Sequence, residues 1–158
     1  MTIKKNNSKK VLKELLTQQT VIMLSTLDEK GFPCTRGMIN IHNAQIAPHL
    51  KNKIGNSGKE IFFTTNTSSA KIKQIKKSSA ACVYLFDGKT FKGIALLGEI
   101  KEVLSEKIKH TFWHKSWAMY YPDGEKGGDY SILKFTPKRY RYYNGGKDFA
   151  KEEGSLKF

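Results

Sequence analysis

The sequence has few cysteines and no long apolar run. Its 158 residues include two cysteines, Cys34 and Cys82, and both fall in segments with the composition of β-strands. We therefore expect reduced thiols rather than a disulfide framework. No segment approaches the ~20 apolar residues of a membrane-spanning helix. The first residues lack the apolar core of a signal peptide, so a cytoplasmic protein without a membrane partner is expected.

Negative charge and arginine are also scarce. The chain carries 28 Lys and Arg against 14 Asp and Glu, a formal net charge of +14. Its only arginines are Arg36, Arg139 and Arg141. Because recognition of bases favours the arginine fork, this composition argues against sequence-specific nucleic-acid binding. The lysine excess fits small anionic ligands or a membrane surface, or serves solubility alone.

The apolar periodicity and the turn residues predict one mainly β domain over residues 1–158, with loose tails at 1–7 and 146–158. Strands are expected at 20–27, 33–41, 60–65, 80–86, 91–103 and 130–143, the last broken near Pro137. Helices are expected at 8–19, 69–77, 105–113 and 117–120, and residues 43–58 read as a loop. Six strands without β–α alternation favour an antiparallel barrel with appended helices.

The most informative segment for chemistry runs from residue 61 to residue 77. An apolar strand end leads into a run of hydroxyl side chains and then into a lysine-rich helix. A helix N-terminus offers unpaired N–H groups and partial positive charge, so hydroxyls together with Lys71 can complete an anion site. The alternative is that Ser69 caps the helix and Lys71 keeps it soluble.

The order of the motifs resembles the split-barrel flavin-binding family of pyridoxamine 5′-phosphate oxidase, and within it the branch of small general stress proteins. The resemblance spans about residues 15–143. The order and the spacing of the motifs together carry the match. The matching stretches are residues 25–33 leading to Arg36, Gly37 and Met38, then 62–66 with Ser69 and Lys71, 97–103, Trp113, 121–124 and 130–137.

The resemblance implies a six-stranded antiparallel split barrel that forms a homodimer, with flavin mononucleotide (FMN) in a groove at the dimer interface. In that family's arrangement Arg36 and Lys71 would face the flavin phosphate, while Thr65 and Ser69 would donate hydroxyl hydrogen bonds and Thr64 would lie nearby. Gly37 and Met38 would lie along the isoalloxazine ring.

One departure concerns the phosphate cradle. Where the pyridoxamine enzyme has adjacent Arg and Lys after the serine, this chain has Ala70 and Lys71, so one positive charge is missing. The substrate-phosphate residues of the true oxidase also have no clear counterpart, and oxidation of pyridoxamine phosphate is therefore not predicted. Flavin chemistry needs no catalytic side chain from the protein, and none is assigned.

Two pairs of residues four apart have alternative interpretations. Trp113 and Trp117 would share a helical face, where packing on the barrel is favoured over a wall for the flavin ring; Trp113 is kept as a candidate for that wall. His110 and His114 have a spacing that can bind zinc, but no third ligand is evident, so no metal is predicted.

Two functions follow from the resemblance. The first is an FMN-dependent oxidoreductase acting on an unknown small molecule. The second is a non-catalytic flavin-binding or stress-related module of the same fold. A basic nucleic-acid-binding barrel is the weaker alternative, and a related flavin or haem could occupy the same groove.

Overall fold

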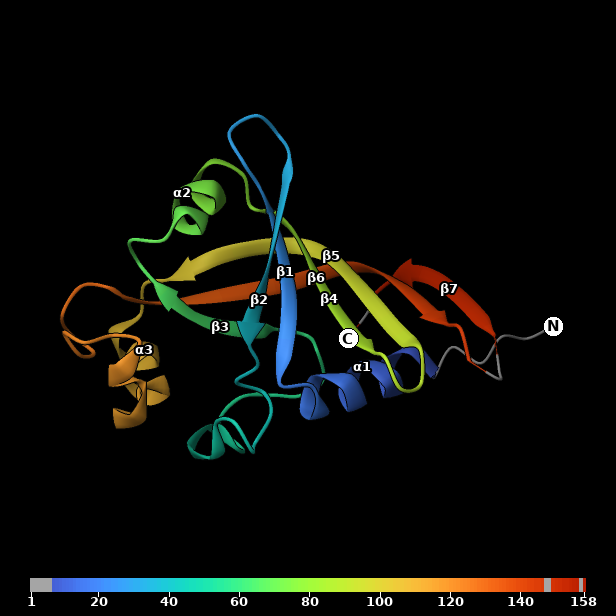
Figure 1. Ribbon diagram of the computed structural model, residues 1–158, viewed down its shortest axis with the longest axis horizontal. Coiled ribbons are helices and arrows are strands. Elements are labelled where there is room, and N and C mark those ends of the chain that lie inside the picture. The colour runs from blue at the N-terminus through green and yellow to red at the C-terminus, as the bar shows by residue number, and fades with distance from the viewer. Residues whose placement is uncertain (1–6, 147–148, 157) are drawn as a thin grey trace.

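The computed structural model describes residues 7–146, 149–156 and 158, and its strands form one curled antiparallel sheet (Figure 1). The strand order is β2-β1-β4-β5-β6-β3, and β7 pairs with β6. Within the described ranges no ladder joins β2 to β3, so the sheet is not closed. The strands are β1 Val21–Leu27, β2 Pro33–Ile39, β3 Ile61–Asn66, β4 Ala80–Asp87, β5 Lys92–Val103, β6 Tyr130–Asn144 and β7 Ala150–Ser155.

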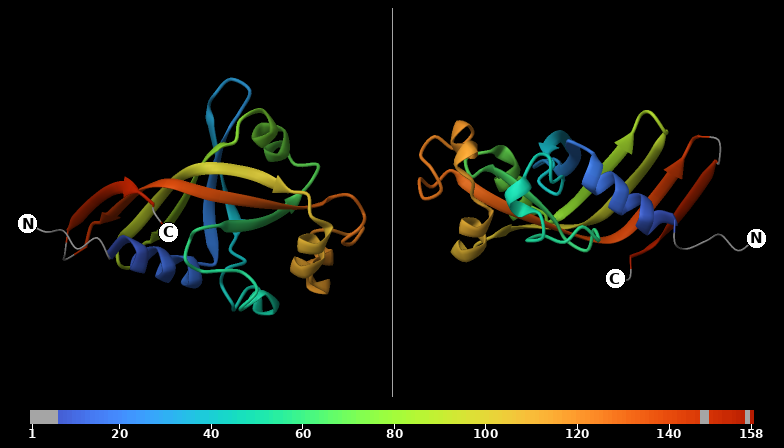
Figure 2. Two further views of the ribbon diagram at one scale, coloured as in Figure 1. Left: turned by 180° about the vertical axis from the view of Figure 1, so that it is seen from behind. Right: turned by 90° about the horizontal axis from the view of Figure 1, so that it is seen from below.

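In the described part of the chain three α-helices and two 3₁₀ turns flank the sheet, close to the expected positions. They are α1 Asn7–Gln18, α2 Ala70–Lys77, α3 Glu106–Phe112, η1 Pro48–Leu50 and η2 Lys115–Met119. α1 lies along the sheet (Figure 2) because its apolar residues recur at helical spacing and all become buried. Among the described residues no helix has the length and apolarity needed to cross a membrane.

The core has two parts, separated by β3 and β6. Ile61 and Phe63 of β3 belong to the main cluster inside the curled sheet, which Ile72 and Ile75 of α2 also enter. Phe62 packs on a second cluster formed with η1, α3 and η2. Because side chains of a strand alternate between faces, β3 presents its odd-numbered residues to the main core.

The predicted break at Pro137 is wrong, because β6 runs without interruption from Tyr130 to Asn144. The irregularity near Pro137 is a β-bulge instead: Leu97 pairs with Arg139 and Gly98 with Pro137, so Lys138 of β6 is the extra residue. A Cβ on Gly98 would lie 2.1 Å from the Thr136 carbonyl oxygen. Glycine therefore permits the close approach that the bulge requires.

The expected loose tail also differs from the structure. Residues 150–155 form β7, which pairs with β6 from Arg139 to Asn144. Glu152 on β7 accepts hydrogen bonds from Ser8 of α1, at 3.3 Å, and from Tyr140. The first six residues of the expected N-terminal tail lie outside the described residues. Both cysteines are free, as predicted.

Candidate functional site

The guanidinium of Arg36 joins the β1–β2 hairpin to α2. Its Nη1 donates to Thr26 Oγ1 at 2.7 Å and to the Leu24 carbonyl at 3.3 Å, and its Nη2 donates to Gln74 Oε1 at 3.0 Å. Thr26 donates in turn to the same Gln74 oxygen at 2.6 Å. Arg36 is therefore held in one orientation although it belongs to a strand near the sheet edge.

Lys71, in the first turn of α2, completes a cluster of donors. Its Nζ donates to Thr65 Oγ1 at 2.9 Å and to Ser69 Oγ at 3.1 Å. Ser69 occupies the N-cap position, but its side chain makes no capping hydrogen bond to the helix. The N-terminus of α2 consequently has no side-chain cap, and its partial positive charge adds to that of Lys71.

The two cations influence each other. The pKa of Lys71 lies below its usual value, first because the ammonium is half-buried and second because the positive charge of Arg36 is near. Burial likewise lowers the pKa of Arg36. Among the described residues neither has a carboxylate within 4.0 Å. Two converging positive charges without an acidic partner, beside two hydroxyls, suit a phosphate dianion.

The loop that leads into α2 is fixed by Asp129. Its carboxylate accepts from the Ser68 backbone N–H at 2.8 Å and from Asn66 Nδ2 at 2.9 Å. The hydrogen bond from the Ser68 N–H is the main reason that the pKa of Asp129 lies below its usual value. Asp129 thereby orders the segment that presents Ser69.

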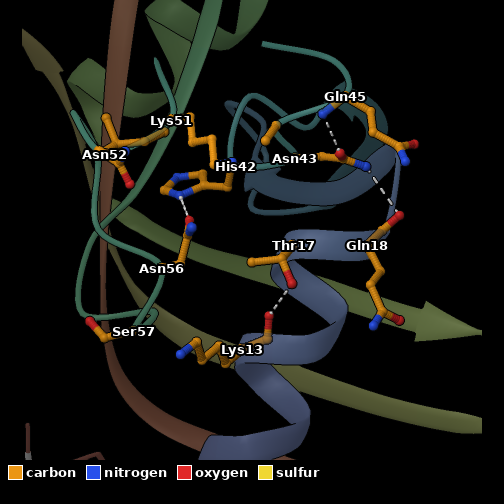
Figure 3. Close-up of a pocket in the computed structure, with 12 residues that line it drawn as sticks. Lys13, Thr17, Gln18, His42, Asn43, Gln45, Lys51, Asn52, Asn56 and Ser57 are labelled. Atoms are coloured by element: carbon orange, nitrogen blue, oxygen red, sulfur yellow. Dashed lines mark hydrogen bonds between the residues drawn. The ribbon is translucent and has the colours of Figure 1, made fainter. Parts of the chain in front are cut away.

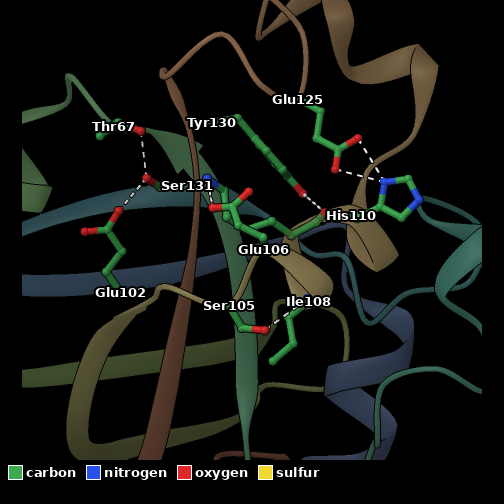
Figure 4. Close-up of polar contacts among 10 residues, drawn as sticks. Thr67, Glu102, Ser105, Glu106, Ile108, His110, Glu125, Tyr130 and Ser131 are labelled. Atoms are coloured by element: carbon green, nitrogen blue, oxygen red, sulfur yellow. Dashed lines mark hydrogen bonds and ion pairs between the residues drawn. The ribbon is translucent and has the colours of Figure 1, made fainter.

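A chain of hydroxyls holds the same loop from the inside (Figure 4). Thr67 donates to Ser131 Oγ at 2.7 Å, and Ser131 donates to Glu102 Oε1 at 2.7 Å. Glu102 also faces Lys76 of α2 at 3.9 Å. Glu102 thus pairs with Lys76 in the last turn of α2, whereas Lys71 lies in its first turn.

Gly37 and Met38 lie in β2 next to Arg36 but face opposite sides of the sheet. Met38 has its side chain buried in the main core, so only its backbone is available to a ligand. Gly37 lies on the outer face, where it pairs with Met23. A Cβ at Gly37 would lie 3.0 Å from Val21 Cγ1, so glycine leaves the exposed backbone of the strand uncovered beside the Val21 side chain.

Thr64 and Trp113 are not brought to this cluster. Thr64 alternates with Thr65 along β3 and faces the second core, where its hydroxyl meets Tyr121. Trp113 packs there too, with ring centroids 5.1 Å from Tyr130 and 6.2 Å from Tyr121. Within one chain both residues lie across β3 from Lys71.

The pairs of Trp and His residues four apart do not share a helical face. α3 ends at Phe112, and Trp117 belongs to the separate turn η2. His110 meets Glu125 at 3.0 Å (Figure 4), whereas the His114 ring stacks on His49 with centroids 4.7 Å apart. In the described part of the chain no three His, Cys, Asp or Glu residues are grouped to hold a metal ion.

The sequence interpretation missed three residues that shape the site. Thr26 and Gln74 orient Arg36, and Asp129 anchors the loop before α2. Gln74 carried a usable signal, since it follows Lys71 by three positions and lies on the same side of the helix. Asp129 is remote in sequence from the loop that it anchors, and no sequence pattern indicated its role.

Comparisons with known proteins identify the family and the fold of the chain. The family model described as pyridoxamine 5′-phosphate oxidase matches residues 8–144. No curated protein matches the sequence.

Two solved structures of stress-related proteins are similar along nearly the whole chain. A Clostridium acetobutylicum protein related to general stress protein 26 of B. subtilis is 25% identical with a TM-score of 0.74, covering 94% of this chain and 96% of that one. General stress protein 26 of Bacillus anthracis is 17% identical with a TM-score of 0.67, covering 94% and 98%.

A haem-binding protein of Mycobacterium smegmatis shares the fold as well. It is 14% identical with a TM-score of 0.62, and the match covers 91% of this chain and 57% of that one. The mainly β split-barrel fold predicted from the sequence is confirmed, with seven described strands in place of six. With its family match spanning most of the sequence, the chain belongs to the pyridoxamine 5′-phosphate oxidase family.

Proposed function

We propose that this protein binds FMN and uses it to oxidise or reduce a small molecule. The observation that carries the proposal is the convergence of Arg36 and Lys71, which lack a carboxylate partner among the described residues and lie beside Thr65 and Ser69. A phosphate monoester would supply the missing negative charge and accept from the fixed donors. When bound, the flavin supplies the hydride or electron transfer.

The ring of the flavin would extend from this phosphate corner along β2. Gly37 offers strand backbone without a side chain there, with Val21 beside it, and the backbone of Met38 supplies polar groups beside the ring. Because Thr64 and Trp113 lie across β3 within one chain, Trp113 could reach the same flavin only from a second copy of the protein.

An apolar sheet face supports such a second copy. Five large apolar side chains on the outer face of β1, β2 and β4 remain between 36% and 50% exposed: Val21, Met23, Ile39, Tyr84 and Phe86. They are contiguous, because Val21 pairs with Ile39 and Met23 pairs with both Gly37 and Tyr84. Exposed patches of this kind mark interaction surfaces. A homodimer would bury the patch and enclose the flavin ring at the interface.

Titration with FMN and with riboflavin, followed by flavin fluorescence, tests the proposal. FMN should bind much more tightly than riboflavin, which lacks the phosphate. Lys71→Ala should weaken FMN binding by about 1–3 kcal/mol and leave riboflavin binding nearly unchanged. Lys73→Ala, on the exposed side of α2, is the matched control. Absence of FMN binding, or equal affinity for both flavins, would contradict the phosphate site.

Two further measurements distinguish FMN from haem as the ligand, and a catalytic from a non-catalytic protein. Haem added to the purified protein would give a Soret band, and displacement of FMN by haem would favour a haem protein instead. For turnover, FMN-loaded protein is reduced with dithionite and its reoxidation by small quinones is compared with that of free reduced FMN. No acceleration with any acceptor would favour the non-catalytic flavin-binding module.

A further inference from the structure

A hollow of about 750 Å³ lies away from the Arg36 and Lys71 corner, between α1 and the segment 42–57 (Figure 3). Lys13 and Thr17 of α1 form one side, and Asn52, Asn56 and Ser57 form the other. No residue of the proposed FMN phosphate site lines it. Its volume lies in the range of small-molecule sites.

The charge of this hollow has one sign. Of the residues that the structure describes, Lys13 and Lys51 are the only charged ones in its lining, and no Asp or Glu is among them. Within the described residues neither lysine has a carboxylate within 4.0 Å. The other polar side chains are neutral hydroxyls, amides and one imidazole. Such a lining attracts anions that also carry hydrogen-bonding groups.

Two buried asparagines donate hydrogen bonds to the carbonyl groups at and just after the C-terminus of α1, which lies beside this surface. Asn40 donates to the carbonyls of Leu16 and Gln19, each at 2.7 Å. Asn43 donates to the carbonyls of Gln18, at 3.2 Å, and Gln19, at 3.3 Å. The carbonyls at a helix C-terminus would otherwise repel an anion. The NH2 groups of both side chains are already engaged in these hydrogen bonds. They shape the hollow, and contacts to a ligand come from its other residues.

The ring of His42 fixes the opposite wall. Its Nε2 accepts from the Phe62 N–H at 2.9 Å, so the proton of the neutral ring lies on Nδ1, which faces the Gly55 carbonyl at 3.1 Å and Asn56 Oδ1 at 3.3 Å. Burial keeps the pKa of His42 at about 4, and the ring is therefore uncharged at neutral pH. The positive charge of the hollow comes from its lysines.

We propose that this hollow binds a small phosphorylated metabolite, distinct from the flavin. Lys13 and Lys51, from two parts of the lining, give the hollow the positive charge that attracts a phosphate dianion. Asn52, Asn56 and Ser57 supply amide and hydroxyl groups that pair with the hydroxyls of the ligand. The rigid wall built by Asn43 and His42 reduces the ordering cost of binding.

Nuclear magnetic resonance of the ¹⁵N-labelled full chain tests this site, with ribose 5-phosphate as the probe and ribose as its uncharged counterpart. Ribose 5-phosphate should shift amides of residues 13–18 and 42–57, and ribose should not. In the double variant Lys13→Gln/Lys51→Gln, the affinity should fall roughly tenfold. The control Lys30→Gln/Lys101→Gln removes the same charge from exposed positions elsewhere and should leave the affinity unchanged.

Three results would overturn the inference. Equal weakening in both double variants would mean general attraction to a basic surface, and an absence of shifts would mean no site. Tighter binding of a single-stranded oligonucleotide across the same residues would assign the surface to a polymer instead. FMN affinity should be unchanged in Lys13→Gln/Lys51→Gln, so failure here is distinguishable from failure of the flavin proposal.

Discussion

The Nη2 of Arg36 and the Oε1 of Gln74 meet at 3.0 Å, which joins the second strand to the helix that carries Lys71. The partner is an amide rather than a carboxylate. An amide oxygen orients the guanidinium without neutralising it, so the positive charge remains available to an anion. An arginine that is held by an amide can still bind an anion, whereas an arginine that is held by a carboxylate forms a structural ion pair.

The first prediction exploits that distinction. In Gln74→Glu a carboxylate would face Arg36 and compete with the flavin phosphate, so FMN affinity should fall roughly tenfold or more. The free energy of unfolding should change by no more than about 1 kcal/mol, because the contact between the side chains is kept. Fluorescence titration and urea denaturation measure the two quantities. Gln45→Glu adds the same charge elsewhere and should not affect FMN; an unaffected affinity in Gln74→Glu would remove Arg36 from the site.

The second prediction concerns stability against pH. The pKa of His42 falls from 6.5 to about 4 on folding, mainly through burial. The unfolded state then binds the proton more readily, so the stabilisation is present above pH 6.5 and is lost as pH falls toward 4. The loss amounts to about 3 kcal/mol. His49, whose pKa is also lowered by burial, acts in the same direction.

Urea denaturation between pH 4 and pH 7.5 measures this loss. His42→Gln should flatten most of the slope over that range, although it lowers stability at neutral pH. His110→Gln, at an exposed position, should keep the slope of the natural sequence. A slope that survives in His42→Gln would assign the pH dependence to other groups.

The third prediction tests the bulge between the two long strands. In Gly98→Ala the added Cβ would lie 2.1 Å from the Thr136 carbonyl oxygen, and backbone has to shift to relieve the clash. We expect a loss of about 1–3 kcal/mol in the free energy of unfolding. Gly55→Ala, where an added Cβ meets nothing within 4 Å, should be close to neutral. Equal stability of the two variants would contradict the bulge.

The fourth prediction tests the apolar sheet face as a dimer interface. Met23 is 36% exposed and pairs with both Gly37 and Tyr84. Met23→Glu would place a charge in the buried centre of a dimer, so light scattering after size exclusion should show a shift toward monomer, together with weaker FMN binding. Leu104→Glu, at a position 80% exposed outside this face, should remain dimeric. A monomeric natural protein would contradict this interface.

Much of the local structure could be predicted from the sequence, because short-range patterns dictate it. Six strands and the helices that flank them lie within a few residues of their expected positions. The C-terminal tail was not predicted correctly. Residues 150–155 are polar, yet they pair as a strand with β6. The segment pairs with the strand just before it, Asn144 with Ala150 and Arg139 with Ser155, but its polar residues lack the apolar alternation by which a strand is recognised in a sequence.

The sequence by itself determined the residue types of the phosphate corner, namely a strand end with hydroxyls, a helix start and Lys71. Only the tertiary structure decided which of them converge. It brought Arg36 to Lys71 through Gln74, and it directed Thr64 and Trp113 to the other side of β3. The reason is physical: alternation along a strand and the seating of a helix depend on which face is buried, and burial is a property of the whole fold.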